Sequence, residues 1–396
     1  MIHSEVARAE KPLTVQSELA EAEAFTGLKD WGSDLAFLEG LSILIDAIED
    51  MKPTVEFRTT TKGRIQHVLR TRLHLREDER NHPEITAADI KKVLVVTGLP
   101  RSGTTVTFDL LAQDPANRWP REWETYAPWP APELATIDTD PRIDVLNNLF
   151  KHLLEVAPEF ATVQRLDCRQ PGECNHIMMM NFDGTDWWAE MGVPKHLAWS
   201  SSQPSEGMYR SHKRVLQQLQ WKGGTGRWLI KAPQHMFDLP GLIKSYPEAD
   251  IVWTHRDPIS TVSSLSSMVS MLQKAFGAPV DLKRIGAEIS DVWITGVLRG
   301  MESREANPDI ERRIIDIPHR DVIKQPAAVV RRIYDKFGLP FTDDLQRRID
   351  TFINESDNAQ RLGKHSHHPA EFGIDPDQVR ERLAPYYKRF GDLLTY

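Results

Sequence analysis

The residues from Gly98 to Thr105 have the types and spacing of a loop that holds a phosphate. A short, β-branched apolar run at 93–96 precedes them and predicts a buried strand, and residues 104–111 resume a helical pattern. Free N–H groups of a glycine loop and of the following helical turn converge on an anion, and the helix dipole adds to the attraction. The succession of strand, loop and helix therefore predicts a phosphate cradle.

The loop lacks the lysine that nucleoside triphosphatases require. Its two glycines are separated by four residues, but Thr104 follows the second glycine where a kinase or ATPase has Lys. The nearest cation is Arg101, inside the loop. We therefore expect a ligand whose reacting group is attached to a single 5′ phosphate. A glycine turn without a ligand is the structural alternative.

The loop resembles the 5′-phosphosulfate loop of the sulfotransferases that use 3′-phosphoadenosine 5′-phosphosulfate (PAPS), and most of all the bacterial branch with a PRSGTT or PRTGTT loop. Residues 25–28 (FTGL) and 82–85 (HPEI) are similar to the helical segment that precedes the loop in that branch, so the resemblance covers most of the chain. It implies PAPS as co-substrate, without a metal. The loop residues that it assigns to PAPS are Pro100, Arg101, Ser102, Gly103, Thr104 and Thr105.

The resemblance also implies an α/β fold, a P-loop-like three-layer sandwich with a mostly parallel central sheet and an N-terminal helical extension. Residues 1–90 are expected to form the extension, packed on a sulfotransferase domain at 91–396. Further short strands are predicted at 228–231, 251–254 and 314–317. Since these strands alternate with helical stretches, a mostly parallel sheet covered on both faces is also the independent expectation.

Polar residues stand where three predicted strands end, and ligands gather at the carboxyl ends of parallel strands. These residues are Arg101, Lys231 with His235, and Arg256. Their coincidence predicts one site, in which Lys231 contributes to cofactor binding.

Arg256 and Ser264 form a second predicted anion site. Arg256 ends a strand and Ser264 lies eight residues later, two turns into a helix whose first turn suits Pro258. The resemblance assigns this pair to the 3′ phosphate of the nucleotide, whereas a salt bridge at a helix cap is the structural alternative. Two phosphate sites favour a 3′,5′-bisphosphorylated adenosine over ATP.

Sulfuryl transfer requires alignment, stabilisation of the leaving oxygen and removal of the acceptor proton. Arg101 and the loop N–H groups can stabilise the leaving oxygen, with Thr104 and Thr105 as further donors. For the base we favour Glu124, at the position where related enzymes carry a Glu, and Glu122 is its competitor.

Two histidines are alternative candidates for a catalytic role. His235 follows Lys231 closely and could face the sulfate or the acceptor. His365 matches a C-terminal histidine that returns to the active site in the family, although His367 replaces the aromatic residue typical two positions later. The choice between Glu124 and a histidine stays open.

The acceptor is expected to be a small or lipid-like molecule with a hydroxyl group. The Met- and Trp-rich stretch at 177–199 is the candidate region for its recognition, and Trp119, Trp123 and Trp129 are candidates for a pocket wall. Core packing is the alternative role for these residues.

The composition of the chain argues against several other classes of partner and cofactor. The chain of 396 residues has 49 basic and 57 acidic residues, a net charge of −8, and no basic block, which argues against nucleic acid. Its two cysteines, Cys168 and Cys174, do not form a recognised zinc spacing with His176, so we expect no metal. Without a long apolar run or the apolar core of a signal peptide, we expect a cytoplasmic protein without stable membrane insertion. A homodimer is left open.

Two alternatives to a sulfotransferase remain at this point. One is a nucleotide-dependent kinase, against which the absent loop lysine counts. The other is a nucleotide-binding protein without catalytic activity.

Overall fold

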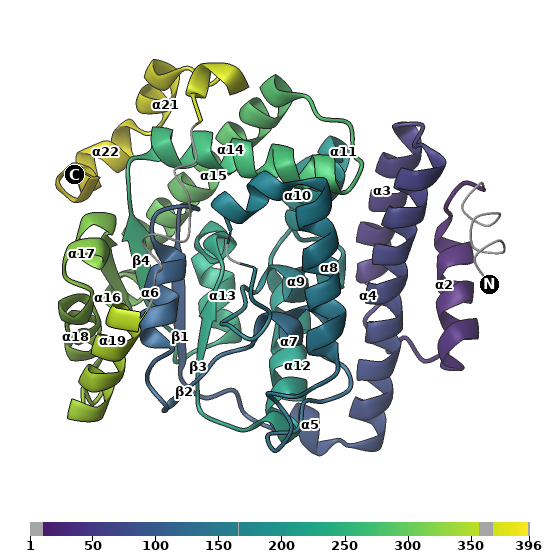
Figure 1. The fold of residues 1–396 in the computed structure, drawn as a ribbon, viewed down its shortest axis with the longest axis horizontal. Helices are drawn as coiled ribbons and strands as arrows, with labels where there is room; N and C mark the ends of the chain where they lie inside the picture. Colours follow the sequence, from purple (N-terminus) through teal and green to yellow (C-terminus); the bar gives the residue numbers. More distant parts are fainter. Residues whose placement is uncertain (1–10, 165, 356–366, 395–396) are drawn as a thin grey trace.

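The structure is a computed structural model that describes residues 11–164, 166–355 and 367–394 (Figure 1). A five-stranded sheet within these residues has the order β2-β3-β1-β4-β5, and its neighbouring strands pair in parallel. The strands are β1 (Val93–Gly98), β2 (Asn117–Arg118), β3 (Arg227–Lys231), β4 (Asp250–His255) and β5 (Ile314–Pro318). The predicted α/β fold is confirmed, and the two-residue β2 is the strand that the sequence did not indicate.

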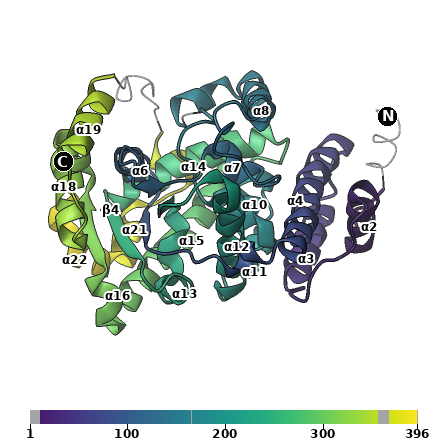
Figure 2. The same ribbon diagram turned by 90° about the horizontal axis from the view of Figure 1, so that it is seen from below.

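Helices cover both faces of the sheet because successive residues of a strand point to opposite sides. Val93 and Val95 of β1 belong to one hydrophobic cluster, and Leu94 and Val96 belong to another. The first cluster includes α12 (Glu206–Gly223), α13 (Leu239–Ser245), α14 (Pro258–Ala275) and α15 (Leu282–Ala306). The second includes α6 (Thr104–Leu111), α17 (His319–Lys324), α18 (Pro326–Phe337) and α19 (Asp343–Glu355). Figures 1 and 2 show these two helical layers on either side of the sheet.

The N-terminal helices form a bundle at one end of the molecule (Figures 1 and 2). They are α2 (Val15–Thr26), α3 (Phe37–Asp50), α4 (Val55–Asn81) and the short α5 (Glu84–Ala87). The Thr54 hydroxyl caps α4 by accepting from the N–H of Phe57 at 3.2 Å. Side chains such as Leu41 and Ile65 share the first hydrophobic cluster with Met180, so the bundle is packed on the rest of the chain.

Shorter elements connect these layers. They are α7 (Glu122–Tyr126), α8 (Arg142–Val156), η1 (Pro158–Thr162), α9 (Asn175–Met178), η2 (Met179–Asn181), α10 (Asp186–Met191), α11 (Pro194–Ser200), η3 (Pro233–Asp238), α16 (Pro308–Arg312), η4 (Pro369–Phe372), α21 (Pro376–Arg382) and α22 (Ala384–Leu394). No helix among the described residues combines the length and the apolar character that crossing a membrane requires.

Candidate active site

The loop between β1 and α6 has the backbone geometry of a cradle. Gly98 has φ +136°, and a Cβ there would meet the backbone oxygen of Thr254 and lie 2.7 Å from its Oγ1, so a larger residue does not fit. Gly103, with φ +95°, is the N-cap of α6 and provides no side-chain hydrogen bond to the first turn. The N–H groups at the start of α6 are therefore not capped by the residue before the helix, as an anion site requires.

The side chain of Ser102 braces the loop against the sheet. It is fully buried, its Oγ donates to the carbonyl oxygen of Leu99 at 2.5 Å, and it lies 2.6 Å from Thr254 Oγ1. Among the other predicted loop residues, Pro100 and Thr104 are buried. The hydroxyl of Ser102 is therefore bonded within the protein.

Two arginines converge on this loop from different strand ends. Arg256, directly after β4, donates from Nη1 to the backbone oxygen of Arg101 at 3.0 Å. Arg101 in turn donates from Nη1 to the backbone oxygen of Val163, just after η1, at 2.7 Å. Burial, and after it the neighbouring Arg256 guanidinium, lowers the pKa of Arg101. The two guanidiniums are thus near enough to repel, and a bound anion would offset this repulsion.

His319 lies beside the cradle, although the sequence did not single it out. It is the first residue of α17, directly after β5, and its ring would lie 3.0 Å from a Cβ added to Gly103. Burial, followed by the charges of Arg256 and Arg101, lowers the pKa of His319 to about 4, so the ring is neutral at pH 7. The sequence rule that polar residues gather at strand ends, applied to the fourth predicted strand, identifies it.

Ser264 lies on α14, whose N-cap is Asp257, and the side chain of Ser264 is largely buried. Asp257 caps the helix by accepting from the N–H of Ser260 at 3.0 Å, and it also accepts from the hydroxyl of Tyr387 at 3.0 Å. Asp257, the residue after Arg256, therefore caps the helix that carries Ser264.

Lys231 contacts both the loop at 98–105 and a carboxylate. It ends β3, is 1% exposed, and donates from Nζ to Thr105 Oγ1 at 3.0 Å. The same ammonium group forms an ion pair with Glu173, and the N–H of Cys174 donates to the backbone oxygen of Lys231 at 2.8 Å. Glu173, which the sequence did not single out, is therefore fixed near the carboxyl ends of β1 and β3.

Glu124, the predicted base, occupies a structural position. It is fully buried, and Oε1 and Oε2 accept from the guanidinium of Arg118 at 2.6 and 3.1 Å. Oε2 also accepts from the backbone N–H of Arg121 at 2.7 Å, at the start of α7. Because both oxygens are engaged, this geometry favours an anchoring role. Its competitor Glu122 is a quarter exposed and lies 3.5 Å from His176 Nε2.

Of the two predicted histidines, His235 is among the described residues and His365 is not. His235 is fully buried in a cluster with His212 and Cys174, so its ring has no exposed surface that could face the sulfate or the acceptor. His365 lies outside the described residues. Nearby His367 is described, and its Nδ1 lies 2.8 Å from the hydroxyl of Ser263 on α14. His367 thus reaches the residue next to Ser264.

The Met- and Trp-rich region is mostly core. The side chains that are at most 4% exposed are Ile177, Met178, Met179, Met180, Phe182, Trp187 and Trp188, whereas Trp199 is partly exposed. Of the predicted wall, Trp123 is fully buried, and Trp119 and Trp129 are half-buried. The buried members pack the hydrophobic core and cannot contact an acceptor in this arrangement.

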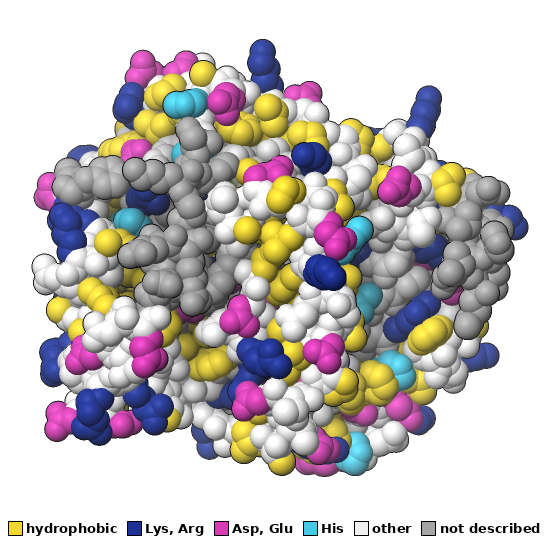
Figure 3. Space-filling model, in the orientation of Figure 1, with side chains coloured by type: hydrophobic (Ala, Val, Ile, Leu, Met, Phe, Trp, Pro, Cys, Tyr) yellow, Lys and Arg dark blue, Asp and Glu magenta, His cyan; other side chains and the backbone are white. Residues whose placement is uncertain are grey.

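An exposed apolar surface lies instead on α8. Its Val145, Leu149 and Val156 are 57%, 43% and 38% exposed. Figure 3 shows apolar side chains interspersed with charged ones in the region that α8 occupies in Figure 1. A cavity lined by Lys92, Asp250 and other residues opens at the amino ends of the strands, the edge opposite to the cradle.

A parallel sheet with a glycine loop and two arginines at its carboxyl edge defines an α/β protein with positive charge beside the loop. The model of the sulfotransferase family matches residues 94–343, more than half of the sequence, and the chain belongs to this family. No curated protein sequence matches the chain.

Two solved structures are similar over nearly the full length. Sulfotransferase STF1 from Mycobacterium tuberculosis H37Rv is 27% identical with a TM-score of 0.81, over 94% of this chain and 99% of that chain. Sulfotransferase STF9 from Mycobacterium avium is 26% identical with a TM-score of 0.83, over 95% of this chain and 96% of that chain.

Proposed function

We propose that the protein transfers a sulfuryl group from PAPS to a hydroxyl group of a small, apolar acceptor. The observation that carries this proposal is the approach of Arg256 to the glycine loop, where its guanidinium donates to the backbone of Arg101. Guanidinium groups suit dianionic phosphates, and two such groups suit a bisphosphorylated nucleotide. Membership of the sulfotransferase family supports a sulfuryl group as the transferred unit.

The donor is proposed to bind with its 5′ phosphosulfate in the cradle and its 3′ phosphate at Arg256 and Ser264. The N–H groups at the start of α6 supply hydrogen bonds and a favourable dipole for the first group. Arg101 and the hydroxyl of Thr105 add a positive charge and a further donor.

Glu173 is proposed as the base in place of Glu124. It removes the proton from the acceptor hydroxyl while the acceptor oxygen bonds to sulfur and the bond between sulfur and the 5′ phosphate oxygen breaks. Lys231 supports this arrangement because it donates to Thr105 on the cradle side and pairs with Glu173 on the acceptor side. Lys231 and Arg101 stabilise the charge that develops on the leaving oxygen.

The acceptor is proposed to lie against the apolar face of α8. This helix leads into η1, and the backbone oxygen of Val163 that follows η1 holds the Arg101 guanidinium. Exposed Val145, Leu149 and Val156 offer an apolar surface on this helix.

Calorimetry with adenosine 3′,5′-bisphosphate and ATP tests the donor. We expect clear binding of the bisphosphate, at least tenfold weaker binding of ATP, and a loss of about 30-fold or more in Arg256→Ala, because a charged pair contributes ~2 kcal/mol or more. Arg210→Ala is the matched control, since Arg210 is an exposed arginine paired with Asp34. Equal affinity for both nucleotides would remove the bisphosphate from the proposal.

Turnover of labelled PAPS with a panel of phenols and long-chain alcohols tests the base. We expect Glu173→Gln to lower kcat by about 100-fold or more with unchanged affinity for the bisphosphate, since general base catalysis contributes ~10²- to 10⁴-fold. Glu122→Gln, the control, should change kcat less than about threefold. Full turnover in Glu173→Gln would overturn the assignment. Tight bisphosphate binding with no turnover on any acceptor would favour a nucleotide-binding protein without catalysis.

A further inference from the structure

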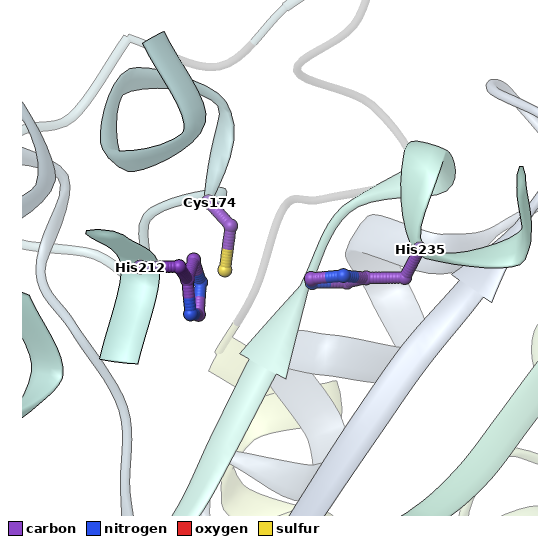
Figure 4. Close-up of side chains that lie close together, drawn as sticks. All are labelled: Cys174, His212 and His235. Carbon is purple, nitrogen blue, oxygen red and sulfur yellow. The ribbon is translucent and has the colours of Figure 1, made fainter. Parts of the chain in front are cut away.

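Cys174, His212 and His235 lie together in the core, although they come from three separate segments (Figure 4). Cys174 precedes α9, His212 lies on α12, and His235 lies on η3. The sulfur and one ring nitrogen of each histidine lie within 4.8 Å of one another, and the side chains are fully buried. Figure 4 shows the Cys174 sulfur pointing toward the two rings.

Within the described part of the chain, each histidine ring has one nitrogen satisfied and one without a partner. His212 Nδ1 lies 2.6 Å from the hydroxyl oxygen of Tyr246, and His235 Nδ1 lies 3.1 Å from that of Tyr209. The Nε2 atoms of both rings are buried and have no hydrogen-bond partner among the described residues. A buried polar atom left unpaired is unfavourable, and two of them in one cluster require an explanation.

Tyr246 and Tyr209 occupy the positions of residues that hydrogen-bond to metal-binding histidines. With the imidazole proton on Nδ1 and donated to the tyrosine oxygen, Nε2 carries the lone pair that a metal ion accepts. Histidines that bind metals are oriented in this way by a hydrogen bond from the other ring nitrogen. The sulfur of Cys174 then completes a set of soft and intermediate ligands.

We propose that Cys174, His212 and His235 form a buried binding site for a soft metal cation with a filled d shell. Ligand atoms at ~2.0 to 2.3 Å from one ion lie ~3.3 to 4.0 Å apart, so shifts of about 1 Å bring these three within range. Binding replaces the thiol proton, which passes to solvent, by the metal ion.

Charge balance favours Cu(I) over Zn(II) as the occupant. A thiolate and two neutral imidazoles neutralise a monovalent ion but leave one positive charge on a divalent ion, which is unfavourable in a buried site. Within the described part of the chain, the cluster offers three ligands, whereas structural zinc sites have four. No motif in the sequence indicates this cluster, because its members are separated by 38 and 23 residues.

Titration of the metal-free, full-length protein with the coloured Cu(I) complex of bicinchoninate, without oxygen, tests the site. We expect the protein to withdraw one equivalent of Cu(I). Cys174→Ser and His235→Gln should withdraw Cu(I) at least tenfold less readily. Cys168→Ser is the matched control, because Cys168 is also a free, buried cysteine but lies near Asn147 instead. A parallel titration against a chromogenic zinc chelator measures Zn(II).

Retained Cu(I) uptake in both Cys174→Ser and His235→Gln would overturn the site, as would uptake of neither ion by the natural protein. Uptake of Zn(II) alone would overturn the choice of Cu(I). A rise in Tm on addition of Cu(I) to the natural protein and to Cys168→Ser, but not to His235→Gln, would support the site independently. Calorimetry with adenosine 3′,5′-bisphosphate on the same variants reports on the proposed function separately, and we expect its affinity to be unchanged.

Discussion

At the scale of single residues, the two candidate glutamates differ in their partners and in their exposure. Glu173 is partly exposed and pairs with Lys231, which also contacts the cradle through Thr105. Glu124 is fully buried and bound on both oxygens by Arg118 and the start of α7. A base must be accessible to the acceptor, and of the two only Glu173 has exposed side-chain surface.

Replacement of Glu124 by Gln is expected to lower stability. The neutral amide leaves the charge of buried Arg118 without a counterion, which costs ~3 to 5 kcal/mol in comparable buried pairs. Urea unfolding monitored by circular dichroism measures this loss. Glu206→Gln is the control and should leave the free energy of unfolding nearly unchanged, since its ion pair with Lys244 is exposed to solvent on both sides. Unchanged stability of Glu124→Gln together with lost turnover would instead restore Glu124 as the base.

At the scale of elements, close packing of α15 on the sheet depends on a glycine. Gly300 is buried, and a Cβ there would lie 2.6 Å from the backbone oxygen of Met236 in η3 and 2.7 Å from the ring of Trp253 in β4. The helix therefore approaches the strand and η3 more closely than any larger residue allows. This contact holds η3, which carries His235, against the rest of the core.

Gly300→Ala is expected to destabilise the protein by ~1 to 3 kcal/mol, although Ala is the better helix former, because the added methyl group overpacks the core. Gly63→Ala is the matched control within α4, since no atom of the described residues outside the helix backbone lies within 4 Å of a Cβ added there. That control should stabilise the protein by ~0.5 to 1 kcal/mol. Denaturant unfolding of both variants measures the difference, and equal effects would contradict the packing argument.

At the scale of the whole molecule, the N-terminal bundle and the α/β part share one hydrophobic cluster. Leu41 and Ile65 of the bundle belong to the same cluster as Met191 and Trp187. Buried Arg64 of α4 also forms an ion pair with Glu190 of α10, with Nε and Oε2 3.1 Å apart. The bundle therefore contributes to the core that supports the site.

Removal of residues 1–90 is expected to prevent folding of the remainder, because it exposes a large apolar surface and leaves Glu190 without its partner. The near-ultraviolet circular dichroism spectrum of residues 91–396 should lack fixed aromatic signals. The full chain should unfold in one cooperative transition with equal calorimetric and van't Hoff enthalpies. A soluble 91–396 fragment that binds adenosine 3′,5′-bisphosphate would show that the α/β part folds alone.

Features that arise within short segments of this chain follow from its amino-acid sequence. The strand and glycine loop at 93–105 are predictable because apolar pattern, loop glycines and helix start are consecutive. The strands that end near Lys231 and Arg256 are equally predictable, and the parallel arrangement follows from their alternation with helices. The rule that strand ends gather at one edge then places Arg101 and Arg256 in one site from sequence alone, and the contact between them agrees with it.

Which distant side chains share an environment depends on the three-dimensional packing of the elements. Glu173 meets Lys231 across 58 residues, and Glu124 is a buried partner of Arg118. Cys174 lies beside two histidines that no sequence spacing connects to it. The physical reason is that these contacts depend on how α9, α12 and η3 pack on the sheet, whereas local hydrophobic periodicity determines only the elements themselves.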